Sequence, residues 1–230
     1  MKKAFFSRKC MSVLAAGALA CGAAQAQLAV TSPAFADGGI IPNPFTYNMG
    51  AQCNGNNWSP PLNIANIPAG TQTLVIVLND TTVPWLHWEV WDIPVPAGET
   101  SVSLPYNAAA SLPASTQAVN DFGANGYGGA CPPPASGTHD YVFTVYALPT
   151  PAGGGQPSAG TLAAVPAADQ GSLTGLRTYG DNVLWTPPGG GGGGGAGAAA
   201  AVPTLNETAL TLLALLLAGA TVVRWRRRQS

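Results

Sequence analysis

Residues 73–94 read TLVIVLNDTTVPWLHWEVWDIP, and this stretch decides the fold class. Its first part, residues 73–78, is a continuous apolar and β-branched run, which is typical of a strand buried on both faces. Residues 87–93 alternate in polarity and are followed by a proline, which predicts a second strand. Residues 141–148 repeat this pattern. Because no amphipathic helix of twelve residues appears before residue 150, the sequence predicts a mostly β, sandwich-like antiparallel fold.

The chain has 230 residues, which is enough for one ordinary domain with appendages. Charged residues make up 8% of the sequence, against roughly 25% in an average domain. Between residues 27 and 201 the chain carries nine carboxylates and a single cation, Arg177, which gives a net charge of about −8. This acidic body lacks the basic patch of a nucleic-acid-binding protein, so we expect no nucleic-acid partner.

The N-terminus has the pattern of a secretory signal peptide. A basic start is followed by an apolar stretch over residues 11–24 and by Ala-Gln-Ala at 24–26. We predict a signal peptide over residues 1–26, with cleavage after its last alanine. The alternative is a lipoprotein acylated at Cys21, but Ala18 stands where a lipoprotein signal has leucine.

The C-terminal segment, residues 202–230, has the pattern of a membrane anchor. It begins Val-Pro-Thr-Leu, continues with an apolar run over residues 209–223 and ends in an arginine cluster. An exported chain with this ending predicts one transmembrane helix with the arginines in the cytoplasm. The segment resembles the IPTL-type sorting signal, which implies processing by an exosortase-type enzyme in a Gram-negative bacterium. It departs from that pattern at Val202 and at Thr208-Ala209, so a plain tail anchor is the alternative.

Two further segments complete the expected domain organisation. Residues 187–201 begin with two prolines, continue with seven glycines and become alanine-rich, which predicts a flexible linker between the domain and the anchor. The folded domain is expected over residues 27–150. Residues 151–186 are rich in proline, glycine and alanine, and the sequence assigns no structure to them.

Two of the four cysteines, Cys53 and Cys131, remain after removal of the signal peptide. In an exported domain this pair predicts one disulfide, with two buried thiols as the alternative. A zinc site needs more ligands than two cysteines and two well-placed histidines, so we expect no metal. We expect no cofactor either.

Four segments follow one another along the chain: NWSPPL at 57–62, DTTVP at 80–84, HWEVWDIP at 87–94, and GYGGACPP at 126–133 followed by HDY at 139–141 and FTVYAL at 143–148. In this order they resemble the phosphatidylethanolamine-binding protein family, especially its bacterial, Raf kinase inhibitor-like branch. The resemblance covers about half of the chain and implies a β-sandwich with few short helices, whose larger sheet backs a small pocket. In that family the pocket takes phosphate-like anions and phospholipid head groups.

The same resemblance implies a set of ligand-binding residues. Two imidazoles can hydrogen-bond an anion, a carboxylate can orient one of them, a phenol adds a neutral donor, and prolines stiffen the rim. By their places in the motifs, these residues are Asp80, His87, Pro132, Pro133, His139 and Tyr141.

The motif departs from the family pattern at two positions that bear on charge. Thr82 stands where the family has its second aspartate, and Asp140 stands where it has an arginine. An anion site here has little long-range attraction, because the body is acidic. A neutral or zwitterionic ligand is therefore an alternative.

Together these features predict an exported, C-terminally anchored or sorted protein that binds a small anion or a phospholipid head group. We expect it on the periplasmic side of the inner membrane before processing and at the cell surface or outside the cell afterwards. A structural surface protein with a vestigial pocket and an inhibitor of an extracytoplasmic protease are the alternatives. Because no Gly-x-Ser-x-Gly motif is present, we do not expect an enzyme.

Overall fold

The computed structural model describes residues 26–50 and 52–188, and the predicted signal peptide, most of the linker and the C-terminal segment lie outside them. Over the described part the fold is mostly β, with few and short helices, as predicted. None of its helices is long and apolar enough to cross a membrane. The elements are β1 (Ala29–Thr31), β2 (Gly39–Ile40), η1 (Asn43–Phe45), β3 (Leu62–Ala65), β4 (Thr73–Asp80), β5 (Trp85–Pro94), β6 (Ser101–Leu104), η2 (Ala108–Ala110), η3 (Ala114–Thr116), β7 (Thr138–Leu148), α1 (Ala159–Ala163), η4 (Ala167–Asp169) and β8 (Gln170–Thr178).

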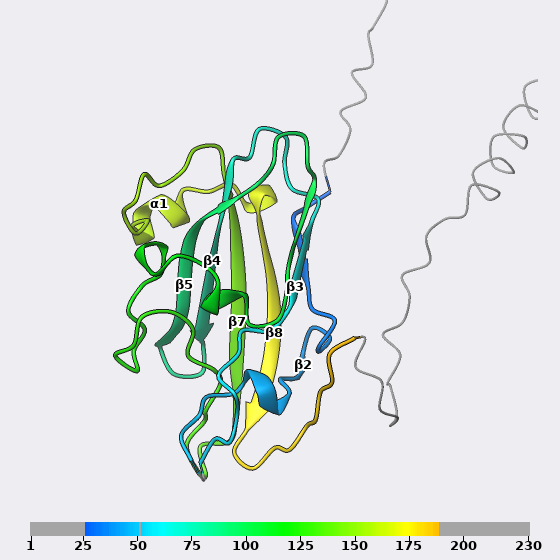
Figure 1. The fold of residues 1–230 in the computed structure, drawn as a ribbon, viewed down its shortest axis with the longest axis vertical. Helices are drawn as coiled ribbons and strands as arrows, with labels where there is room; N and C mark the ends of the chain where they lie inside the picture. The colour runs from blue at the N-terminus through cyan, green and yellow to red at the C-terminus, as the bar shows by residue number, and fades with distance from the viewer. Residues whose placement is uncertain (1–25, 51, 189–230) are drawn as a thin grey trace, which may run out of the picture.

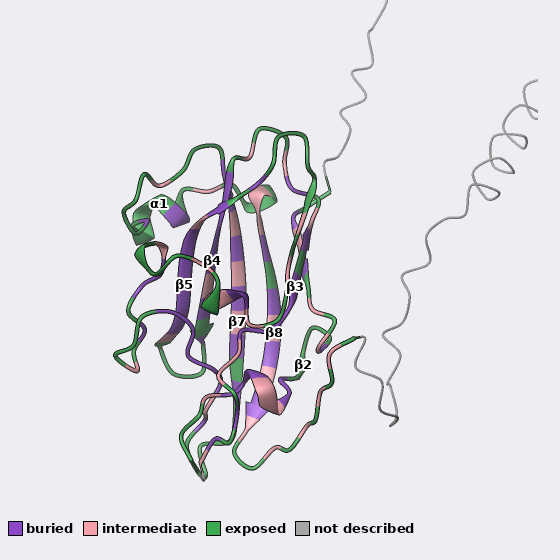
Figure 2. Ribbon diagram, viewed as in Figure 1, coloured by how far each residue is buried: buried purple, intermediate pink, exposed green. Residues whose placement is uncertain are grey.

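The strands form two sheets. The larger has the order β2-β8-β7-β4-β5 and the smaller the order β1-β3-β6. Figure 1 shows β5, β4, β7 and β8 as long twisted strands side by side, with β3 beyond β8. Buried side chains from both sheets meet in one core, which includes Ile64 of β3, Ile76 of β4 and Phe143 of β7. The longest buried stretch runs along β4 and β5 (Figure 2).

The larger sheet is mixed, which corrects the expectation of an antiparallel arrangement throughout. β2 runs parallel to β8 and pairs Gly39 with Gly175. The pairing depends on a close approach, because a side chain at Gly175 would meet the Ile41 side chain at 2.4 Å. The backbone N–H of Ile41 donates to the Leu176 carbonyl at 2.9 Å and continues the ladder. β2 thereby closes one edge of the sheet.

The folded domain extends beyond residue 150, where the sequence places its end. β8 lies inside the larger sheet, between β2 and β7, and its residues alternate between buried and partly exposed. Its inward positions include Leu173 and two glycines, Gly171 and Gly175, so glycines stand at two of the places where an apolar side chain usually identifies a strand. The region that looked like a proline- and glycine-rich extension therefore supplies a central strand.

A second, smaller core covers the outer face of β4 and β5 and includes Trp91 and Leu162. Glu89 of β5 also lies on this side and is only 7% exposed. Its carboxylate accepts a hydrogen bond from Nε2 of Gln156 at 2.7 Å. Its other oxygen has no partner among the described residues, and the same is true of Nε1 of Trp91. Burial raises the pKa of Glu89, because desolvation penalises the ionised form.

We predict that Glu89→Gln stabilises the protein at pH 8 by about 1 kcal/mol, the low end of the cost of desolvating a polar group, because the amide removes a buried negative charge and keeps an oxygen that accepts from Gln156. A carboxyl whose folded pKa is raised binds more protons in the folded state, so its unfavourable contribution grows as pH rises through that pKa. The advantage of the variant should disappear below the usual pKa of glutamate. Urea unfolding at pH 8 and pH 4 measures this difference.

The matched control is Glu99→Gln, because Glu99 is exposed. This variant should unfold as the parent does at both pH values. Equal stability of Glu89→Gln and the parent at pH 8 would contradict the interpretation that the buried Glu89 carboxylate destabilises the fold.

Candidate functional site

The register of β4 against its two neighbours brings the main predicted site residues together. Asp80, the last residue of β4, lies opposite Tyr141 of β7 and opposite Trp85 of β5. His139 lies two residues before Tyr141, so both belong to the same face of β7. His87 is the third residue of β5. Residues far apart in the sequence therefore meet at one end of the sheet.

The Asp80 carboxylate is held by three hydrogen-bond donors. Its Oδ1 accepts from the backbone N–H groups of Thr82 at 2.9 Å and Val83 at 3.2 Å, in the turn between β4 and β5. Its Oδ2 lies 2.5 Å from Nδ1 of His139, and both side chains are buried. Because an ionised carboxylate only accepts hydrogen bonds, Nδ1 of His139 carries the proton. The turn therefore fixes Asp80, and Asp80 fixes the histidine ring.

The two positions that depart from the family pattern contact one another. The backbone N–H of Asp140 donates to Oγ1 of Thr82 at 2.9 Å. The backbone N–H of Thr81 donates in turn to the Asp140 carbonyl at 2.8 Å. Thr82 therefore ties the β4–β5 turn to the start of β7, and Asp140 itself is exposed. Neither residue lines the cavity described below.

His87 occupies the other wall of the site. Its Nδ1 lies 2.8 Å from the Gly128 carbonyl, which can only accept, so Nδ1 carries the proton here as well. The ring makes edge-on contacts with Phe122 at 5.2 Å and with Tyr141 at 5.0 Å between centroids. Burial lowers the pKa of His87, although the Gly128 carbonyl and Asp80 oppose this effect. His87 is therefore neutral near pH 7, with an unprotonated Nε2.

Tyr141 adds a neutral phenol to the site. Its side chain is buried between the two histidines, with ring centroids 5.0 Å from His87 and 6.4 Å from His139. Burial and the nearby Asp80 carboxylate raise the pKa of Tyr141, so its hydroxyl keeps the proton at any physiological pH. It can donate a hydrogen bond to a bound group.

Five of the six predicted ligand-binding residues line one cavity of about 400 Å³. The sixth, Pro132, lines a neighbouring cavity instead. The lining contains two carboxylates, two imidazoles and no lysine or arginine. Within residues 26–50 and 52–188, no three His, Cys, Asp or Glu side chains are grouped to hold a metal ion. The lining residues are Met49, Gln52, Asp80, Val83, Trp85, His87, Asp121, Phe122, Cys131, Pro133, His139 and Tyr141.

Cys53 and Cys131 form a disulfide, which is the paired state of the two alternatives left open by the sequence. It joins loops that are 78 residues apart in sequence. Cys131 lines the histidine cavity and Cys53 lines the neighbouring one, so the bridge stands between the two. The disulfide is therefore part of the wall of the site.

Sequence reasoning missed the loop that forms the mouth of the cavity. Phe122 stacks on Tyr47 with a centroid distance of 4.1 Å and meets Trp85 edge-on at 5.6 Å. Asp121 accepts a hydrogen bond from the backbone N–H of Leu86 at 2.6 Å, which holds this loop against β5. The fold of the loop depends on Asn120, whose Oδ1 accepts from two backbone N–H groups. The only sequence signal is the turn-forming composition around these residues.

Asn57 explains why the NWSPP segment belongs to the site although it lies outside the cavity. Its Nδ2 donates to the Tyr127 carbonyl at 3.0 Å, and its Oδ1 accepts from the Gly129 N–H at 2.7 Å. Asn57 thereby holds the loop whose Gly128 carbonyl binds His87. A side chain at Gly128 would meet the Phe122 ring at 2.6 Å, so glycine is required at that contact.

Residues 31–183 match the family model described as phosphatidylethanolamine-binding protein. The chain belongs to the phosphatidylethanolamine-binding protein family. The match includes β8, in agreement with the extent of the fold. Residues 200–227 match the IPTL-CTERM motif, which confirms the sorting signal expected at the C-terminus.

The chain is also similar to individual proteins, in sequence and in structure. A UPF0098 protein of Aquifex aeolicus is 36% identical over 122 residues, which cover 52% of this chain and 67% of that protein. A putative lipoprotein, LppC of Mycobacterium tuberculosis, is 38% identical over 125 residues, covering 53% of this chain and 56% of LppC. The crystal structure of Escherichia coli YbcL aligns with a TM-score of 0.53 at 29% identity, over 70% of this chain and all of that one.

The disulfide allows a direct test of the loop arrangement. We predict that the double variant Cys53→Ala/Cys131→Ala loses about 3–4 kcal/mol of unfolding free energy, because the bridge closes a long loop of the unfolded chain. Urea unfolding measures the loss. The control is Cys10→Ala/Cys21→Ala, which changes only residues of the predicted signal peptide. An unchanged unfolding midpoint in the first variant would contradict a structural role of the bridge.

Proposed function

We propose that the protein is an exported, C-terminally sorted binding protein whose histidine cavity takes a phosphate-like group, free or within a phospholipid head group. The observation that carries this proposal is the placement of His87, His139, Asp80 and Tyr141 on one cavity. Membership of the phosphatidylethanolamine-binding protein family supports it.

The protonation state of the two imidazole rings determines whether the ligand must donate or accept a hydrogen bond. Each Nδ1 proton is engaged, by Asp80 or by the Gly128 carbonyl, so the remaining nitrogen of each ring, Nε2, is left for a ligand. A neutral ring offers a lone pair there and accepts from a P–OH group. A protonated ring donates instead and adds positive charge.

The charge of the lining narrows the ligand class further. Asp80 and Asp121 are both carboxylates, and protonated histidines are the only positive groups among the lining residues. A multiply charged anion is therefore opposed by the site unless the histidines are protonated. A zwitterionic head group fits better, because its phosphate reaches the histidines while its ammonium lies near Asp121. The exposed ring of Trp85 beside Phe122 offers a π face to the same ammonium.

A binding role rather than catalysis is supported by the composition of the lining. No serine, threonine or lysine lines the cavity, and the one cysteine there is in the disulfide. The hydroxyl of Tyr141 is held in the protonated form by its raised pKa. The lining described here therefore lacks an activated nucleophile of the usual kinds.

The cellular setting of this proposal rests on three features outside or beside the cavity. The first 26 residues have the pattern of a signal peptide, and residues 200–227 match the IPTL-CTERM motif. A disulfide fits an oxidising compartment. We infer transfer to the periplasmic side of the inner membrane, retention there by the C-terminal apolar segment, and processing by an exosortase-type enzyme before release to the cell surface.

The experiment is calorimetric titration of the full chain in neutral detergent with phosphate, phosphoethanolamine and acetate at pH 6 and pH 8. Binding of phosphate should strengthen at pH 6 relative to pH 8, because the ligand then carries less negative charge against Asp80 and Asp121 and offers a further P–OH donor to the unprotonated Nε2 of His87. Phosphoethanolamine should bind more tightly than phosphate at pH 8. His139→Ala should weaken binding about 10- to 100-fold, the scale of one charged hydrogen bond.

Asp140→Asn is the matched control, because it changes the exposed neighbour of His139 and should leave the affinity unchanged. Absence of saturable binding of all three compounds at both pH values, in a folded protein, would refute the proposal. That result would favour a structural surface protein or a protease inhibitor built on the same fold.

A further inference from the structure

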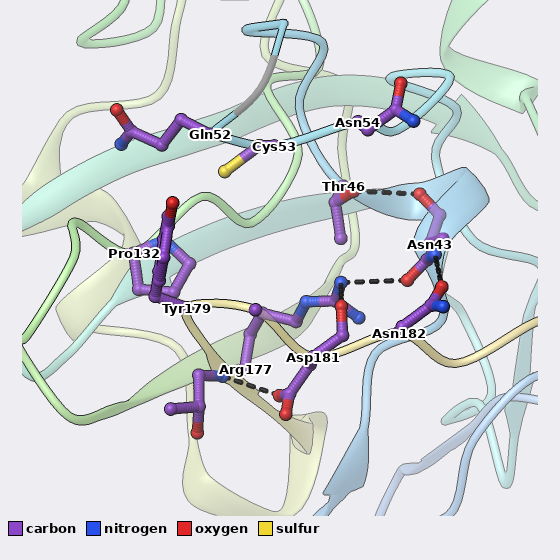
Figure 3. Close-up of a pocket in the computed structure, with 12 residues that line it drawn as sticks. Asn43, Thr46, Gln52, Cys53, Asn54, Pro132, Arg177, Tyr179, Asp181 and Asn182 are labelled. Atoms are coloured by element: carbon purple, nitrogen blue, oxygen red, sulfur yellow. Dashed lines mark hydrogen bonds between the residues drawn. The ribbon is translucent and has the colours of Figure 1, made fainter.

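A second cavity, of about 280 Å³, lies on the other side of the Cys53–Cys131 disulfide and has a different chemistry. Its lining is formed by the segment around Gln52 and Asn54, facing the end of β8 and the residues that follow it. Figure 3 shows Arg177 between these two walls, with Tyr179 beside Pro132. Neither histidine, Asp80 nor Tyr141 lines this cavity.

Arg177 is the only arginine or lysine of the described residues, and it is 7% exposed. Its guanidinium donates to the Ile41 carbonyl at 2.6 Å, to Oδ1 of Asn43 at 2.8 Å and to the Asp181 carbonyl at 2.5 Å. A guanidinium has five N–H donors, so two remain without a recorded partner in this part of the chain. Burial lowers the pKa of Arg177, which the Asp181 carboxylate opposes.

Carboxamides and a phenol supply the rest of the polar lining. The side chains of Gln52 and Asn54 make no recorded hydrogen bond to any described residue, and neither does the Tyr179 hydroxyl. A carboxamide donates and accepts at once, as a hydroxyl does. The Tyr179 ring is 43% exposed, so its face is accessible beside the cavity.

We propose that this cavity binds one neutral sugar unit. The guanidinium and the carboxylate of Asp181 line the same cavity, so their charges balance and favour a neutral ligand over an anion. Sugar hydroxyls are donors and acceptors at once, which matches the carboxamides of Gln52 and Asn54. The exposed Tyr179 ring offers a negative π face to the weakly positive C–H groups of a sugar ring.

This assignment gives an exported protein a second ligand, independent of the histidine cavity. Sugar polymers surround bacterial cells, so a sugar subsite on the folded domain would hold it in that layer after release from the membrane. The two cavities share Gln52 and the disulfide as a wall, but their lining is otherwise different. Variants of residues that line only one cavity therefore report on binding in that cavity alone.

The test is saturation-transfer NMR followed by calorimetry on the full chain in neutral detergent, with glucose, galactose, N-acetylglucosamine, glucuronate and inorganic phosphate as probes. At least one neutral sugar should bind with a dissociation constant of about 1 mM, the range of one small polar ligand. Tyr179→Ala and Asn54→Ala should each raise that constant about fivefold. Asn56→Ala, at an exposed position outside the cavity, should not change it.

Tyr179 and Asn54 are exposed, so both variants should keep the amide spectrum of the parent and isolate the binding effect. Failure of every neutral sugar to bind would overturn the proposal, and so would sugar binding that neither variant weakens. Binding of glucuronate or phosphate alone, lost in Arg177→Lys, would also overturn it, because the cavity would then be an anion site. Phosphate binding that is lost in His139→Ala would come from the histidine cavity, so it is told apart from binding in this one.

Discussion

The antiparallel register of β4 against β5 and β7 is the constraint on which the site depends. It sets Asp80 opposite both Trp85 and Tyr141, and it brings His139 within 2.5 Å of the Asp80 carboxylate. A shift of one residue in a strand turns every side chain to the other face. Such a shift would remove the hydrogen bond that orients His139. The alternation of buried and more exposed residues along β7 opposes such a shift, because it would turn the apolar side chains of β7 out of the core.

The sequence was informative wherever a strand carries its own apolar pattern. The runs at 73–78, 87–93 and 141–148 lie in β4, β5 and β7, which also hold Asp80, His87, His139 and Tyr141. β8 was not recognised from the sequence, because two of its inward positions, Gly171 and Gly175, are glycines rather than large apolar residues. Because glycine has no side chain, Leu28 packs directly against Gly171 and Ile41 packs directly against Gly175. This packing depends on residues that are distant in the sequence, so the local pattern of residues 170–178 does not reveal the strand.

The finer features of the site came from loops, where spacing carries little information. Pro132 and Pro133 are adjacent in sequence but line different cavities, because the disulfide of Cys131 lies between those cavities. Asp121 and Phe122 reach the cavity mouth through hydrogen bonds made by Asn120. Thr82, a departure from the family pattern, has a role in joining the turn to β7. The loss of a charged residue there therefore leaves the frame of the site in place.

The central claim is that both histidines present an unprotonated Nε2 to the cavity, with the proton on Nδ1. The chain contains only two histidines, so long-range proton–nitrogen NMR of the uniformly labelled protein gives two ring patterns. At pH 8 without ligand, the account predicts that both rings have the proton on Nδ1, with the most downfield proton signal at His139, next to Asp80. A proton on Nε2 in either ring would contradict it, because that ring's Nδ1 would then lack the proton for its hydrogen bond to Asp80 or to the Gly128 carbonyl.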